Sequence, residues 1–189
     1  MSAPAVRGLP VEEWVSAERG LLEFVEVVDG EFVVKRLGGN PHHYIARRLA
    51  QAFEDQWDGV FANAPGNWTL RSAADGAVLL GRVPDVLVDG NALLAEPAFR
   101  GVPDAVVEVW SPGNTLAEMN AKRREYRATG LPVLLEAFLT DTGDVHLEWL
   151  VNEGERWVSA AVAAGETSLV VATPRPFEVV PNDLLRRAR

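Results

Sequence analysis

The sequence has no cysteine and only two lysines, and it contains no long apolar run. The lack of cysteine excludes a disulfide framework and a thiolate metal site, and it is typical of a protein kept in the cytoplasm. No stretch approaches the ~20 apolar residues of a membrane-spanning helix, and the first ten residues lack an apolar signal segment. These absences lead us to expect a soluble, cytoplasmic protein that does not contact a membrane.

Positive charge is also scarce, because 18 basic residues stand against 27 acidic ones and give a formal net charge of -9. This balance excludes a broadly basic surface for nucleic acid, so any such contact has to be local. The chain has 189 residues, of which 48% are hydrophobic and six are tryptophans. That is enough to bury the core of one domain, whereas two domains would be small. We therefore expect a single domain over residues 1–189.

Two acidic residues interrupt apolar strand patterns in the middle of the chain. The alternation of RVPDVLV places Asp85 on an otherwise apolar face of a predicted strand. The alternation of DAVVEVW does the same for Glu108, in a strand whose two faces both look buried. Burying an ionised carboxylate costs several kcal/mol unless a cation or hydrogen-bond donors compensate it. Two such acids on consecutive strands predict a shared cation.

A helix with a lysine follows Glu108. Ser-Pro-Gly at 111–113 ends the strand, Thr115 and Glu118 form a possible capping box, and Gly130 ends the helix. Its predicted apolar stripe consists of Leu116, Met119 and Tyr126, and Lys122 lies one position from this stripe. Lysine can lose or share a proton, whereas arginine cannot. In a chain with sixteen arginines, a lysine beside a carboxylate pair is a candidate catalytic group.

The order of these pieces resembles the Uma-two family of restriction endonucleases, a bacterial branch of the PD-(D/E)xK nucleases. The likeness consists of an aspartate after proline, a glutamate on the next strand, a Ser-Pro turn, and a helix with Lys122 and Tyr126 before a Gly-x-Pro. It extends roughly from Val27 to Phe138. In the standard motif the lysine lies two residues after the acid, a position that Trp110 takes here, so the resemblance implies that Lys122 has the role.

The resemblance implies an α/β (α+β) fold, with a restriction-endonuclease-like core at about 20–140 in which helices flank a central mixed β-sheet. Strand patterns at 144–151, 155–162 and 167–173 add a C-terminal β-meander at about 144–180. The implied activity is metal-dependent cleavage of DNA that leaves a 5′-phosphate, carried out by a homodimer. Asp85 and Glu108 would bind Mg²⁺ or Mn²⁺ together with waters and the Val109 carbonyl, and Lys122 would orient or deprotonate the attacking water.

Three further residues are possible accessory groups. Apolar strands around Asp29-Gly30 predict a hairpin, and Asn40-Pro41 begins a helix that reaches about Trp57. The family has a similar Asp-Gly-Glu hairpin before a helix that carries a histidine, and Glu31 and His43 match those positions. Tyr126 would bind a phosphate or simply pack. Further patterns predict a short helix from Pro10, strands at 67–73, 77–80 and 131–139, and a loop at 58–66.

Structural alternatives remain for each residue. Lys122 could pair only with Glu118, Asp85 could end a strand near solvent, and Glu108 could pair with an arginine such as Arg82 or Arg123. Glu31 and His43 could be solvent-facing, and we expect Asp104 to be a strand-start residue and not a metal ligand. At 134–137 the chain has Leu-Leu-Glu-Ala, where the family usually has an aromatic-rich segment that ends in valine and aspartate.

Two other functions stay open from the sequence. The acidic balance favours a non-catalytic, dimeric binding or scaffolding protein that keeps the nuclease fold. The same acids and lysine would also suit hydrolysis of RNA or of another phosphodiester.

Overall fold

The computed structural model describes residues 8–21, 24–35, 39–90 and 98–186. By its contacts the chain divides into two compact units, and each is described by itself. Unit 1 consists of Met1–Leu37, Gly66–Val83 and Leu94–Gly101, and unit 2 of Gly38–Pro65, Pro84–Leu93 and Val102–Arg189. The expectation of one domain over residues 1–189 stays a prediction. In the described part of the chain, no helix has both the length and the apolar character that crossing a membrane requires.

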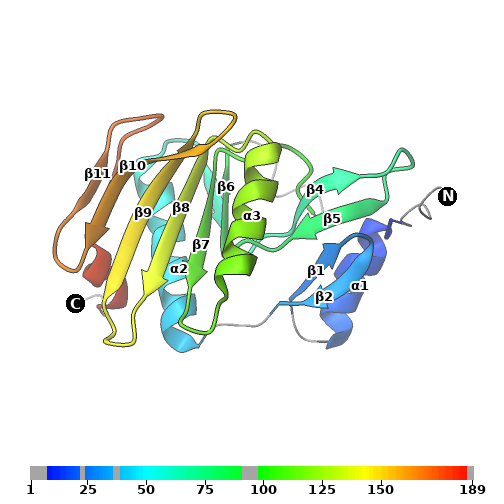
Figure 1. The fold of residues 1–189 in the computed structure, drawn as a ribbon, viewed down its shortest axis with the longest axis horizontal. Coiled ribbons are helices and arrows are strands. Elements are labelled where there is room, and N and C mark those ends of the chain that lie inside the picture. Colours follow the sequence, from blue (N-terminus) through cyan, green and yellow to red (C-terminus); the bar gives the residue numbers. More distant parts are fainter. Residues whose placement is uncertain (1–7, 22–23, 36–38, 91–97, 187–189) are drawn as a thin grey trace. The chain divides into compact units, whose positions relative to one another are not determined.

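Unit 1 contains a four-stranded antiparallel sheet and one helix (Figure 1). The strand order is β2-β1-β5-β4, and the elements are α1 (Val11–Leu21), β1 (Val25–Val28), β2 (Glu31–Val34), β4 (Trp68–Ser72) and β5 (Val78–Arg82). The predicted hairpin is confirmed, because β1 pairs with β2 and both turn residues, Asp29 and Gly30, have positive φ. Trp14 of α1 is fully buried against Gly81 of β5, where a Cβ atom would lie 2.6 Å from the indole.

Unit 2 is built on a six-stranded mixed sheet with the order β10-β9-β8-β7-β6-β3. Its strands are β3 (Phe61–Asn63), β6 (Val86–Asp89), β7 (Ala105–Trp110), β8 (Val133–Leu139), β9 (Val145–Asn152) and β10 (Trp157–Ala164). Only β7 and β8 are parallel among these pairs. Parallel neighbours need a long crossover, and α3 (Leu116–Ala128) provides it between them.

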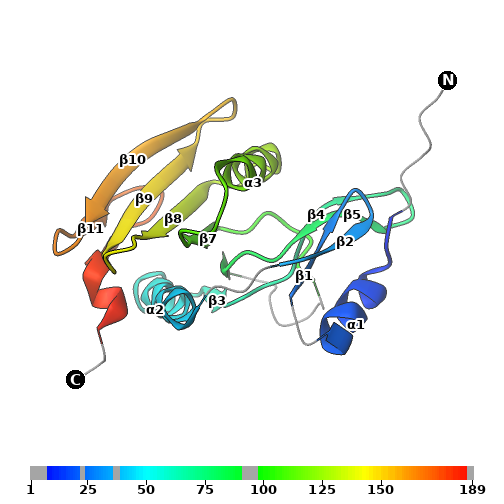
Figure 2. The same ribbon diagram turned by 60° about the horizontal axis from the view of Figure 1, so that its bottom comes forward.

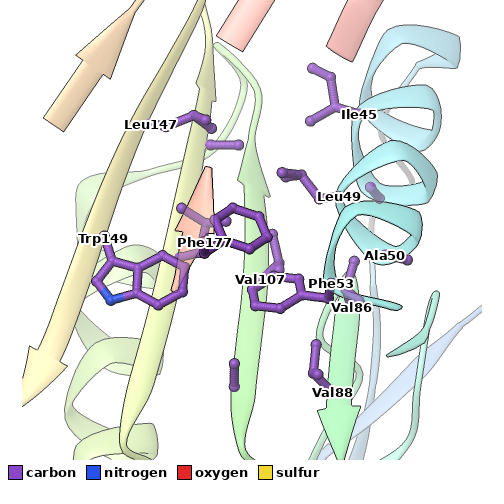
Figure 3. Packing of buried hydrophobic residues seen from close by; sticks show 14 of the residues in the cluster. Ile45, Leu49, Ala50, Phe53, Val86, Val88, Val107, Leu147, Trp149 and Phe177 are labelled. Atoms are coloured by element: carbon purple, nitrogen blue, oxygen red, sulfur yellow. The ribbon is translucent and has the colours of Figure 1, made fainter. Parts of the chain in front are cut away.

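The hydrophobic core of unit 2 lies between the sheet and α2 (Asn40–Gln56). Figure 3 shows Ile45, Leu49 and Phe53 of α2 directed toward the side chains of the sheet. The Phe53 ring stacks on Phe177 with 4.5 Å between ring centroids and lies near Trp149. All six residues of β7 are buried, which confirms that this strand is covered on both faces.

Helix α3 covers the opposite face of the same sheet (Figures 1 and 2). Its predicted apolar stripe is wrong in part, because Leu116 is 68% exposed. The buried residues of α3 are instead Lys122 and Tyr126. This helix therefore packs on the sheet largely through polar side chains. Its position depends on the β7 residues that these side chains contact.

Three predictions of local structure are corrected. The strand expected to run through Asp85 is interrupted, because β5 ends at Arg82 and β6 begins at Val86. Pro84 has no N–H to donate to a sheet, which explains the break. The loop expected at 58–66 contains β3, and two elements near the C-terminus were not predicted: β12 (Phe177–Val179), which pairs with β11 (Leu169–Val171), and the 3₁₀ helix η1 (Pro181–Leu185).

Candidate active site

Glu108 lies at the centre of the candidate site. It is 2% exposed and sits on the face of β7 that α3 covers. Its Oε1 and Oε2 atoms accept hydrogen bonds from the Lys122 Nζ atom at 3.0 and 3.2 Å. The Tyr126 hydroxyl, one turn further along α3, donates to Oε1 at 2.5 Å. Both groups come from one helix face, because residues four apart lie above one another.

These contacts decide between the alternatives left open for Lys122 and Glu108. Lys122 is 3% exposed and pairs with Glu108, so the interpretation that it pairs only with Glu118 is wrong. Arg82 pairs with Glu26 within unit 1, and Arg123 pairs with Glu136. The start of α3 is as predicted in one respect, because the Thr115 hydroxyl caps it by accepting from the backbone N–H of Glu118.

Asp85 directly precedes β6, the strand next to β7. The residue after it, Val86, pairs with Val107, the residue before Glu108. Asp85 is 6% exposed, which overturns the alternative that it ends a strand near solvent. Its Oδ2 atom accepts from the backbone N–H of Val109 at 2.7 Å. The structure thus buries all three residues that the sequence singled out, and it joins Lys122 to Glu108.

A histidine that sequence reasoning missed contacts Asp85. The Nε2 atom of His42 lies 3.0 Å from Asp85 Oδ1, and its Nδ1 atom lies 3.4 Å from the Ser111 hydroxyl. Either ring nitrogen of histidine can carry a proton, and the two ring nitrogens of His42 thus contact one group each.

The predicted neighbour, His43, is exposed, and its ring stands edge-on to that of His42. The signal that could have found His42 is helical periodicity. His42 precedes Ile45 by three residues and Leu49 by seven, so it belongs to the buried face of α2. The role predicted for His43 stays a prediction, while the geometry favours His42.

Two other candidates from the sequence are Glu31 and Asp104. Glu31 begins β2 in unit 1 and is exposed, so its accessory role stays a prediction. Asp104 is half-buried, directly before β7, and its backbone N–H donates to the Val88 carbonyl. This position agrees with a strand-start residue.

A second buried carboxylate with its own cation lies next to Glu108. Glu136 of β8 is fully buried, and it pairs in register with Glu108 across the parallel strands. The Arg123 Nε atom donates to both Glu136 carboxylate oxygens at 2.9 and 3.0 Å, and its Nη2 atom contacts Oε2 as well. Hydrogen bonding to Glu136 raises the pKa of the Arg123 guanidinium, although burial acts to lower it. An isolated acid inside an apolar run was the signal here, as it was for Glu108.

The donors at Asp85 and Glu108 fit a hard divalent cation. Mg²⁺ binds oxygen ligands and usually takes one or two protein carboxylates with waters and substrate phosphates. Among the residues that the structure describes, no three His, Cys, Asp or Glu side chains form a group that could hold a metal ion. Lys122 contacts both carboxylate oxygens of Glu108, so a cation bound to this acid would compete with it.

Comparisons with known proteins agree on one family and fold. Residues 12–179 match the model of the Uma2 (Uma-two) family, described as "Putative restriction endonuclease". A crystal structure from Anabaena variabilis, described as "a putative nuclease belonging to DUF820", has a TM-score of 0.55 and 12% sequence identity. The match covers 81% of this chain and 83% of that one, and it confirms the restriction-endonuclease-like fold expected from the sequence. No curated protein matches the chain.

Proposed function

Because the chain belongs to the Uma2 family, described as "Putative restriction endonuclease", we propose that it is a metal-dependent DNA endonuclease. In this proposal Asp85 and Glu108 bind Mg²⁺, and Lys122 acts on the attacking water or on the phosphate. The proposal includes a homodimer, because a protein that cuts both strands of a duplex often uses two sites, and two-fold symmetric dimers are the commonest oligomers.

One observation carries the proposal most directly. The chain has two lysines, and one of them is buried on both oxygens of an acid that itself lies beside a second buried acid. Stability alone is a weak reason for such a group, since buried ion pairs are often no more stabilising than apolar side chains of similar volume. Buried titratable groups that contact one another are typical of catalytic sites.

The residues present suit hydrolysis of a phosphodiester. When bound at Asp85 and Glu108, Mg²⁺ would neutralise charge on the phosphate and make a bound water more acidic. His42 and the Val109 N–H hold the Asp85 carboxylate in a fixed orientation, so that it needs little reorganisation to bind a cation. A cation held by Glu108 would take the place of the Lys122 ammonium, which would then be available to a water or to a phosphate oxygen.

The test compares wild type with Glu108→Gln, which keeps the size of the side chain and removes its charge. Calorimetric titration of Mg²⁺ or Mn²⁺ and nicking of supercoiled plasmid are followed in the same buffers. We expect metal binding and nicking to be lost together in this variant. The matched control is Asp104→Asn, an acid just before the same strand, which should change neither measurement by more than about twofold.

Two other outcomes identify the alternatives. If wild type binds no metal even with DNA present, the acids are structural and the protein is a non-catalytic binding or scaffolding protein. If metal binds but only an RNA substrate is cut, the same site hydrolyses RNA. Comparing duplex DNA, single-stranded DNA and RNA of one sequence separates these cases.

A further inference from the structure

Two buried acids and two consecutive cations face one another across β7, β8 and α3. Glu108 and Glu136 are register partners on the parallel strands, which lie about 4.8 Å apart in such a sheet. Both carboxylates face α3, where Lys122 and Arg123 follow each other in sequence. Two adjacent buried anions require two cations. The arrangement therefore depends on which cation binds which acid.

The guanidinium of Arg123 binds Glu136. It donates through Nε and Nη2, and the Nη2 atom also lies 3.6 Å from Glu148 of β9. Such a forked arginine–carboxylate pair is stronger and more directional than a lysine contact. In addition, the backbone carbonyl of Arg123 accepts from the Trp157 indole N–H at 2.8 Å. These contacts fix the turn of α3 that carries Lys122.

Trp110 joins the two pairs. It is 4% exposed and lies two residues after Glu108 on the same strand face. Its indole N–H donates to Glu136 at 3.1 Å, while its ring lies 5.8 Å from the Lys122 ammonium. One side chain thus completes the hydrogen bonds of Glu136 and offers a π-face to the lysine.

We propose that Glu136, Arg123 and Trp110 are positioning residues, in which Glu136 retains the guanidinium of Arg123 so that Lys122 is the cation on Glu108. If Glu136 loses its charge, Arg123 remains a partly buried cation that has lost a strong hydrogen-bond acceptor. Glu108 is then a neighbouring acid that it can bind instead. A guanidinium on Glu108 would displace the ammonium and would not give way to a metal ion or exchange a proton. The importance of this placement for catalysis rests on the proposed function, whereas the placement of Lys122 itself does not.

The closing experiment measures that placement without using nuclease activity. Folded protein in EDTA is treated with a trace of acetic anhydride, and the rate of acetylation of Lys122 is measured by peptide mass spectrometry. Lys35, the other lysine, lies in unit 1 and serves as the internal reference. The variants are Glu136→Gln, Arg123→Met and the double variant, with Glu148→Gln as the control for loss of a half-buried acid near the same arginine.

We expect Glu136→Gln to raise the acetylation of Lys122 relative to Lys35 by about fivefold or more, because Arg123 then takes Glu108. The double variant lacks the competing cation, so its Lys122 should return to within about twofold of wild type. If Glu136 and Arg123 had only a structural role, the acetylation of Lys122 should not fall back in the double variant, because that variant lacks both residues of the pair. Glu148→Gln should have little effect.

The proposal is overturned if Glu136→Gln leaves Lys122 as protected as in wild type, or if the double variant is labelled as strongly as the single one. Should Glu136→Gln fail to fold, Glu136→Asp carries the test, with an intermediate rise expected and an unchanged rate counting against the proposal. Metal binding and plasmid nicking are measured on unlabelled, EDTA-free portions of the same protein preparations. If the acetylation of Lys122 follows the expected pattern but the protein does not nick plasmid, the nuclease function alone is refuted.

Discussion

At the scale of single residues, the described part of unit 2 holds four buried carboxylates, and the partners of Asp85, Glu108 and Glu136 come from its two helices. His42 of α2 binds Asp85, while Lys122 and Arg123 of α3 bind Glu108 and Glu136. Removing one partner of such a buried pair costs about 3–5 kcal/mol, because the remaining charge loses its compensation. These pairs therefore hold both helices in position against the sheet, and they also hold the charged groups of the candidate site in position.

His42→Gln should weaken Mn²⁺ binding at Asp85 by about 10–100-fold and lower the nicking rate to a similar extent, because outer groups that orient a metal-binding carboxylate have effects of this size. The matched control is His43→Gln, since this neighbour is exposed and should change both quantities by about twofold or less. Calorimetry and plasmid nicking of the two variants check the prediction. Equal losses in both, or a larger loss in His43→Gln, would return the role to His43.

At the scale of elements, the two helices of unit 2 are held in different ways. Helix α2 covers the sheet with an apolar face, whereas α3 buries Lys122 and Tyr126 and exposes Leu116. The C-terminal strand β12 completes the core under α2 through Phe177, which is 2% exposed and packs on Phe53 and Trp149. The strands after residue 165 are thus part of the core of unit 2 and not an appendage.

Phe177→Ala should destabilise the protein by about 3–5 kcal/mol, because it leaves a cavity within an aromatic cluster. Val170→Ala, in the strand paired with β12, removes a side chain that is 61% exposed and should cost less than about 0.5 kcal/mol. Urea unfolding followed by tryptophan fluorescence and circular dichroism measures both. A small loss in Phe177→Ala would mean that β12 adds little to the core.

Elements with strong local patterns could be predicted from the sequence, and elements made by tertiary pairing could not. The hairpin at Asp29-Gly30 follows from its turn residues, α3 from its Thr115 cap, and α2 from the proline in its first turn and its apolar period. Strand β3 has three residues and exists through its pairing with β6, and β12 follows two prolines that indicate a loop. Short strands of this kind are decided by contacts with distant residues.

The candidate site shows the same division. Asp85 and Glu108 could be found because each is a lone acid in an apolar pattern, and the order of the motif singled out Lys122 as the catalytic lysine. The pairing of Lys122 with Glu108 instead of Glu118 depends on how α3 packs on β7, which no local pattern states. Glu136 carried the same signal as Glu108, but its partner Arg123 is one of sixteen arginines and has no distinguishing context.

At the scale of the whole molecule, charge limits how the protein can bind nucleic acid. The net charge is -9, so a phosphate backbone is repelled over most of the surface and attracted only where cations gather. Salt dependence reports the number of phosphates that a protein neutralises, with a slope of log K against log salt of about -0.9 for each phosphate in duplex DNA. An acidic protein with a metal-dependent site should neutralise few of them.

We therefore expect Lys122→Met, which keeps both carboxylates and loses the lysine, to bind a labelled duplex only with Mg²⁺ present. The expected slope is shallow, roughly -2 to -4, which corresponds to a few phosphates. Fluorescence anisotropy between 50 and ~200 mM salt measures it. Adding Glu108→Gln to this variant should abolish the Mg²⁺-dependent part, because one of the two acids that would hold the cation is lost. Binding without metal, with a slope steeper than about -6, would instead require an extended basic surface and would exclude a contact confined to the site.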